Sequence, residues 1–164
     1  MAMIDPILAE LEQESKATKR VLERVPADKL AWTPHQKSYT IGQLALHIAR
    51  IPGAIAEAAR ADSFEPPRQQ AQPKDHAEVM QTFDQSLTRA VEIYREMDDL
   101  KLMQPWTATV NGKPVMTIPR IAVIRRIALN HLYHHRGQLV VYLRLLDVPV
   151  PSVYGPSADE NPFM

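Results

Sequence analysis

The sequence of 164 residues contains no cysteine and carries no net charge, because 19 basic residues balance 19 acidic ones. The absence of cysteine excludes disulfides, thiolate metal ligands and a cysteine nucleophile, so any thiol chemistry would need a thiol from a bound cofactor. A nucleic-acid-binding domain normally carries an excess of basic residues gathered in a patch. We therefore expect a small-molecule substrate and no nucleic-acid partner.

Long apolar segments are absent as well. No run approaches the roughly 18 apolar residues of a membrane-spanning helix, and the first 15 residues show neither the basic nor the apolar region of a secretory signal. We therefore expect a cytoplasmic protein that makes no membrane contact. A chain of this length buries about 70% of its unfolded surface, which predicts a single domain over residues 1–164 that folds without disulfides or a structural metal.

Apolar residues recur every three or four positions in four stretches of the chain, the pattern of amphipathic helices. The predicted helices cover residues 6–25, 41–61, 76–97 and 118–146. Asp5 and Pro6 open the first helix as N-cap and first helical residue, and Thr40 and Asp75 are the N-caps of the second and third. Pro52 lies inside the second helix and predicts a kink there.

Between the third and fourth helices the pattern changes from helical to alternating. Residues 106–110 alternate as a strand does, and Asn111-Gly112 is typical of a type I′ turn, so residues 113–116 can return as a second strand. Four amphipathic helices can bury their apolar stripes only against one another. The predicted fold is therefore an all-α four-helix bundle with a small β-hairpin between helices 3 and 4.

The C-terminal tail, from residue 149 onward, has too many prolines for a helix and too many apolar residues for disorder. We expect it to lie extended against the helices. Val150, Val153 and Tyr154 are its predicted anchors.

Three of the six histidines lie in one five-residue segment, 131–135, inside the fourth predicted helix. His131 and His135 are four residues apart and continue the apolar stripe of that helix, so their rings project from the same face. This is the spacing of a two-histidine metal site. His134 points about 100° away from His135 and is not expected to bind the metal.

A third histidine, His47, lies on the inward stripe of the second helix, where an unpaired imidazole is costly to bury. Neutral imidazoles suit Zn, Ni, Cu or Fe, and three of them leave positions open for water or substrate. The alternative is that these rings are hydrogen-bonded core histidines, with the polar residues around His134 forming a partly solvated face. His76, in the exposed first turn of the third helix, is not expected to be a ligand.

Several polar residues are candidates for the wall of a pocket around these histidines. Ser15 and Thr18 occupy inward positions of the first helix, where their hydroxyls either bond carbonyls of their own helix or line a cavity. Gln43, near His47, and Tyr142, on the fourth helix, are further candidates for this wall.

Three sequence strings together resemble the DinB family of the DinB/YfiT-like metalloenzymes, in order and spacing over essentially the full chain. They are Leu44-Ala-Leu-His47-Ile, Asn130-His131-Leu-Tyr-His134-His135-Arg136-Gly137-Gln138-Leu139 and Val150-Pro-Ser-Val-Tyr154-Gly155. The resemblance implies a four-helix bundle, often a homodimer, that holds a divalent metal, commonly nickel or zinc. By the same resemblance the ligands are His47, His131 and His135. Many relatives carry an acidic residue at the position of Asn130.

The resemblance also implies a class of reaction. The related superfamily includes thiol transferases that use bacillithiol, mycothiol or glutathione, and a thiol-dependent maleylpyruvate isomerase. We therefore expect a metal-dependent thiol S-transferase that acts on small electrophiles with a low-molecular-weight thiol as second cofactor. Two interpretations stay open beside it. One is a metal-water hydrolase, for which the fourth helix offers no glutamate near His131 and His135, and the other is a metal-binding stress-response protein without catalysis.

A homodimer is expected on two grounds besides the resemblance. A chain without net charge tends to associate near neutral pH. Helices 1 and 3 also carry apolar residues outside their main stripes, including Val21, Val91 and Ile93.

Overall fold

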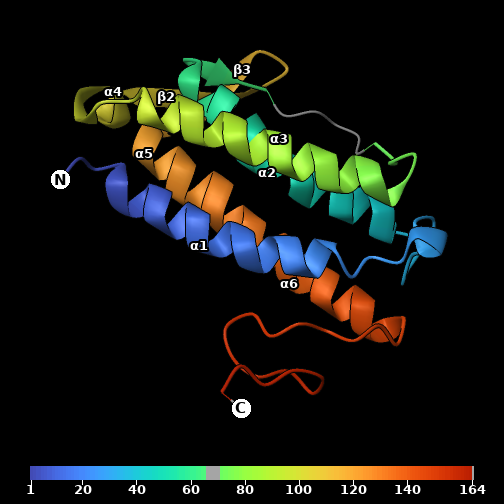
Figure 1. Ribbon diagram of the computed structural model, residues 1–164. Helices are drawn as coiled ribbons and strands as arrows, with labels where there is room; N and C mark the ends of the chain where they lie inside the picture. The colour runs from blue at the N-terminus through green and yellow to red at the C-terminus, as the bar shows by residue number, and fades with distance from the viewer. Residues whose placement is uncertain (66–70, 164) are drawn as a thin grey trace.

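The computed structural model describes residues 1–65 and 71–163 (Figure 1). The elements that position the site are α1 (Asp5–Leu22), α2 (Ile41–Arg60), β1 (Ser63–Phe64), α3 (His76–Arg95), α4 (Asp99–Met103), β2 (Pro105–Val110), β3 (Lys113–Pro119), α5 (Arg120–Val123) and α6 (Asn130–Leu145). A π-type segment, Ile124–Leu129, joins α5 to α6. Residues 66–70, which belong to the proline- and glutamine-rich connection between α2 and α3, lie outside the described residues.

The long helices pack around one apolar core. α2 packs against both α3 and α6, and α1 lies along α6 and also contacts α3 (Figure 1). The core cluster takes side chains from each of these helices, among them Leu11, Ile48, Phe83 and Leu139. The mostly helical character predicted from the apolar spacing is therefore confirmed, and the helices are accompanied by a small sheet.

The first helix differs from its prediction at both ends. Its N-cap is Ile4, because the Asp5 carboxylate instead accepts a hydrogen bond from the Ala2 N–H at 2.8 Å. Its last residue is Leu22, three positions earlier than expected. The Leu22 carbonyl accepts the Val25 N–H at 3.1 Å and also lies 2.9 Å from Nε2 of His76. The prediction of an exposed His76 is therefore wrong, since this ring is half-buried at the end of α1.

α2 begins with a capping box and continues through Pro52. The Thr40 hydroxyl accepts the Gln43 N–H, and the Gln43 side chain accepts the Thr40 N–H in return. At the proline, Ser86 of α3 supplies hydrogen bonds from outside the helix: its hydroxyl accepts the Gly53 N–H at 2.7 Å and donates to the Arg50 carbonyl at 3.1 Å. α3 thus supports α2 one turn beyond His47.

The sheet has the strand order β1-β2-β3. β2 and β3 pair antiparallel across a two-residue turn whose central residues, Asn111 and Gly112, have φ angles of 52° and 72°. Both angles lie in the left-handed region that a type I′ turn requires. β1 pairs parallel to β2, with Ser63 opposite Thr107. This strand was not predicted from the sequence, because two residues are too few for an alternating pattern.

Two buried side chains tie the sheet to the end of α2. Nε1 of Trp106 donates to the Ala58 carbonyl at 2.7 Å, and the guanidinium of Arg120 donates to the Ala59 carbonyl at 2.9 Å. The last carbonyls of a helix have no partner within it, so these donors satisfy them. The sheet is thereby held over the C-terminal half of α2.

The fourth predicted helix starts at Arg120 and is not uniform. The π-type segment Ile124–Leu129 lies immediately before α6. A π-type turn holds more residues than an α-helical turn, so it rotates the residues before Asn130 relative to those after it. The predicted inward positions are nevertheless buried or half-buried both within this segment and after it, as Ile124, Ala128 and Leu139 show.

The C-terminal tail follows α6 and runs back beneath it (Figure 1). Val150 is buried and Val153 is half-buried, as expected of anchors, but Tyr154 is 71% exposed. Tyr154 holds the tail through its hydroxyl, which donates to a Glu14 carboxylate oxygen at 2.8 Å. The same carboxylate pairs with the buried guanidinium of Arg136 at 2.7 Å. One ion pair thus connects α1, α6 and the tail.

Two expectations about surfaces can be compared with the structure. None of the helices in the described part of the chain is both long and apolar enough to cross a membrane.

The prediction that apolar residues of helices 1 and 3 form a dimer surface is wrong for the residues named. Val21 and Ile93 are fully buried in the core, and Val91 is half-buried. The homodimer itself stays a prediction.

Candidate metal centre

Three histidines from two helices come together through their Nε2 atoms. His47 projects from α2, and His131 and His135 project from the first two turns of α6. Nε2 of His131 lies 2.8 Å from Nε2 of His135 and 3.2 Å from Nε2 of His47. The candidate ligand atoms of all three lie within 4.8 Å of one another. The structure therefore brings together the three residues that the sequence singled out.

The neighbouring histidine is placed differently. His134 is exposed, and its ring stacks edge-on against His135 with 4.9 Å between centroids. It is not part of the three-histidine group. Its position is consistent with the prediction that it is not a ligand.

Gln138 sets the orientation of His135. Its side-chain oxygen lies 2.7 Å from Nδ1 of His135, one turn along α6. With the proton on Nδ1 donated to this oxygen, Nε2 of His135 carries a lone pair directed at the other two rings. The amide oxygen and the ring proton are assigned from this contact.

Hydrogen bonds account poorly for the cluster. A ring nitrogen carries either a proton or a lone pair. If Nε2 of His131 donates its proton to His135 at 2.8 Å, His47 at 3.2 Å can only share that same proton. A cation accepting all three lone pairs gives each nitrogen a partner of its own. Metal–nitrogen bonds of about 2.0–2.1 Å place neighbouring ligand nitrogens about 2.9–3.4 Å apart, and the two contacts fall close to that range.

The electrostatics also keep these rings in the form that binds metal. Burial, and to a smaller extent the charges of the neighbouring His135, His47 and His134, lower the pKa of His131 from 6.5 to about 4, against a smaller opposite effect of the Ile127 backbone. Burial likewise lowers the pKa of His135, although its hydrogen bond to Gln138 acts in the opposite direction. Both rings are therefore neutral at neutral pH, as a metal ligand must be.

The cluster opens on a cavity of about 540 Å³ between α2, the start of α6 and the sheet. Most of its lining is apolar, and the lining residues other than the histidines are Tyr39, Arg50, Ile51, Ala54, Ile55, Phe64, Trp106, Ala108, Met116 and Ile127. The strand residues of this wall were not predicted from the sequence. They lie near the histidines only because distant segments pair in the sheet. The cavity has the size and composition of a small-molecule site.

The four polar residues proposed for the wall do not line this cavity. Ser15 donates to the Leu11 carbonyl at 2.7 Å and Thr18 to the Glu14 carbonyl at 2.8 Å, which confirms the alternative of bonding within their own helix. Gln43 is occupied in the cap of α2. Tyr142 packs edge-on against Trp32, with 5.8 Å between ring centroids. The prediction that these side chains form the pocket wall is therefore wrong.

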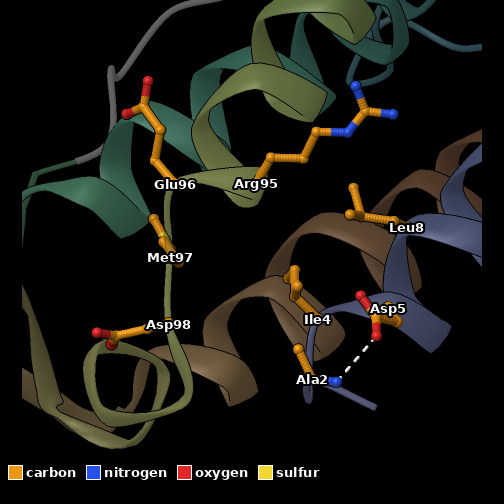
Figure 2. Close-up of a pocket in the computed structure, with 8 residues that line it drawn as sticks. All are labelled: Ala2, Ile4, Asp5, Leu8, Arg95, Glu96, Met97 and Asp98. Carbon is orange, nitrogen blue, oxygen red and sulfur yellow. Dashed lines mark hydrogen bonds between the residues drawn. The ribbon is translucent and has the colours of Figure 1, made fainter.

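A second hollow, of about 560 Å³, lies between the start of α1 and the end of α3 and is shown in Figure 2. Its ionisable side chains do not converge. The Asp5 carboxylate is engaged by the Ala2 N–H, and the Glu96 and Asp98 carboxylates point away from the α1 side of the hollow (Figure 2). It offers no arrangement comparable to the histidine cluster.

The family of the chain follows from a comparison with known proteins, in which residues 3–162 match the model of the DinB family. The chain belongs to the DinB family. The resemblance carried by the histidine strings is thereby confirmed. Metal binding by the three residues stays a prediction at this point.

Individual relatives are distant. The uncharacterized protein YrdA of Bacillus subtilis is 23% identical over 161 residues, which cover 96% of this DinB chain and 91% of YrdA. A DinB-like protein from Bacillus cereus superposes with a TM-score of 0.74 at 24% identity, covering 92% of this chain and 97% of that one. The DinB-like protein YjoA of Bacillus subtilis gives a TM-score of 0.69 at 18% identity, covering 87% and 93%. At these identities the structures establish a shared DinB-like fold.

Proposed function

We propose that this DinB-family protein binds a divalent metal ion, nickel or zinc, through Nε2 of His47, His131 and His135. We propose further that it is a metal-dependent thiol S-transferase acting on small electrophiles. The observation that carries the proposal is the convergence of three Nε2 atoms at one side of an apolar cavity. When bound, such an ion would act as a Lewis acid that favours the thiolate form of a thiol.

The residues of the chain have separate tasks in this proposal. Gln138 holds His135 in one tautomer through the contact at 2.7 Å. The apolar wall, with Phe64, Trp106 and Met116, binds the body of the electrophile and keeps bulk water away from it. In the transfer itself a sulfur–carbon bond forms as the bond from carbon to its leaving group breaks, and the thiol proton passes to solvent. The sulfur is external, since the chain has no cysteine.

Hydrolysis is less well supported. A metal-water hydrolase would use a carboxylate as general base beside the metal. No aspartate or glutamate is among the described residues that line the cavity. The apolar wall instead suits an organic electrophile, and the thiol-transferase proposal is therefore preferred.

The test is turnover of the electrophile monochlorobimane by metal-loaded protein with glutathione, bacillithiol and mycothiol in turn. We expect a rate that depends on one of these thiols and that is lost in His47→Ala and His135→Ala. His134→Ala is the matched control, because this neighbouring ring is exposed and outside the cluster. The absence of a thiol-dependent rate in the metal-loaded wild type would contradict the transferase and favour the two alternatives, a metal-binding stress-response protein without catalysis and a metal-water hydrolase.

We also propose an oligomeric state and a location, namely a homodimer of four-helix bundles in the cytoplasm. Sedimentation of the purified protein tests the oligomeric state. A monomer at all concentrations would contradict the homodimer without bearing on the metal site.

A further inference from the structure

One wall residue of the histidine cavity carries a permanent charge. Arg50 follows His47 by three positions on α2, so the two side chains are neighbours on one helix face. Among the described residues of the lining, the remaining side chains are apolar except for Tyr39, the Trp106 indole and the three histidines. The Trp106 indole already donates to the Ala58 carbonyl. Arg50 is therefore the charged group that a ligand in this cavity meets.

The guanidinium of Arg50 has no polar partner among the residues that the structure describes. No ion pair or hydrogen bond joins it to any residue in the described ranges 1–65 and 71–163. Glu57, which borders a shallow hollow on the outer side of Arg50, is already paired with Arg60 and Arg89, both at 2.7 Å. Because Glu57 is already paired with two other arginines, the guanidinium of Arg50 is available to an anionic ligand.

The backbone beneath Arg50 is nevertheless fixed. Its carbonyl accepts a hydrogen bond from the Ser86 hydroxyl at 3.1 Å, at the point where α3 supports α2 beside Pro52. The backbone at Arg50 is thus held, while the residue as a whole is exposed. A planar guanidinium presents two parallel donors that match the two oxygens of a carboxylate.

We propose that this cavity binds an apolar small molecule bearing a carboxylate, with the carboxylate paired to Arg50. The apolar body occupies the space between Arg50 and the histidines, within a cavity of about 540 Å³. The inference rests on the proposed function, because it assigns the chemical class of the ligand at the same site. The carboxylate belongs either to the electrophile or to the thiol, since both kinds of molecule can carry one.

The experiment compares acids with their neutral amides by calorimetric titration. One pair is 4-phenylbutyrate and its primary amide, which represent a carboxylated electrophile, and the other is 3-mercaptopropionate and its amide, which represent a carboxylated thiol. Each is titrated into the wild type, Arg50→Gln and Arg50→Lys, with metal content measured in every sample. We expect the wild type to bind the acid of at least one pair about tenfold or more tightly than the amide.

The variants show where the carboxylate binds. We expect Arg50→Gln to abolish the preference for the acid while leaving the amide affinity unchanged, and Arg50→Lys to retain part of the preference. Arg95→Gln is the matched control, because Arg95 is also exposed and lines the other hollow (Figure 2). It should leave the preference intact. The pair that shows the Arg50-dependent preference identifies the source of the carboxylate.

Two results would overturn the inference. One is an equal affinity for acid and amide in both pairs, or no binding of either acid. The other is a preference for the acid that persists in Arg50→Gln, which would place the carboxylate on the metal. Titrations repeated on metal-free protein separate this inference from the proposed function. If the wild type binds no metal, the metal-centre proposal fails, whereas the comparison of acid with amide still decides the role of Arg50.

Discussion

Gln138 decides which nitrogen of His135 faces the other two histidines, because its side-chain oxygen lies 2.7 Å from Nδ1. We expect Gln138→Ala to weaken metal binding by about 10- to 100-fold, the usual effect of removing a partner that orients a ligand. Competition with a chelator of known affinity measures this change. Gln81→Ala, at an exposed position of α3, is the control. Wild-type affinity in Gln138→Ala would show that the cluster orients itself without this contact.

The lowered pKa of His131 predicts how the stability of the metal-free protein depends on pH. The folded state holds this ring neutral down to about pH 4, whereas an unfolded histidine takes up a proton near 6.5. The folded state thus binds fewer protons in this window. We expect full stability above about pH 6.5 and a progressive loss as the pH falls towards 4.

Urea denaturation of metal-free protein across this range measures the effect, with His131→Gln as the comparison. The variant lacks the titrating ring and should lose less stability over the same interval. Parallel curves for the two proteins would contradict the assignment of the effect to His131.

At the scale of single residues, the three clustered histidines could be predicted because helical spacing alone puts them on inward faces. Arg136 could not. It lies in the same string as the histidines but is 2% exposed and pairs with Glu14 of α1. A sequence pattern assigns a charged residue to the surface unless its partner is known, and this partner lies 122 positions away.

The pair between Glu14 and Arg136 joins three elements and carries a prediction of its own. We expect Glu14→Ala to lower the free energy of unfolding by about 3 kcal/mol or more, because it leaves the buried Arg136 guanidinium without a counter-charge and removes the carboxylate that accepts the Tyr154 hydroxyl. Urea denaturation measures this change. Glu12→Ala is the matched control on α1, since Glu12 is exposed and pairs with the exposed Lys16. Its expected effect is below about 1 kcal/mol. Similar losses in both variants would contradict the account.

The regular helices could be predicted from local sequence signals, whereas the irregular elements could not. Thr40 and Asp75 cap α2 and α3 as their residue types predict. The π-type segment Ile124–Leu129 before α6 has no comparable signal. An apolar residue every three or four positions does not distinguish a π-type turn from an α-helical one, so the periodic pattern does not contain this irregularity.

For the molecule as a whole, the fold brings together a metal-type cluster from α2 and α6 and an apolar wall from the sheet. The cluster was predictable, since each histidine has its own signal on an amphipathic helix. The wall was not, because β1 pairs with β2 across 44 positions, as between Ser63 and Thr107. The sequence therefore predicts the histidine cluster of this DinB protein better than it predicts the cavity beside that cluster.

The most direct test of the central claim, a metal ion held by three histidines, is the metal content of protein purified without chelator. Elemental analysis would compare the wild type with His47→Ala, His131→Ala, His135→Ala and the control His134→Ala. We predict bound nickel or zinc in the wild type and in His134→Ala, and its loss in the other three variants. Equal metal content in all five proteins, or none in the wild type after exposure to both metals, would contradict the account.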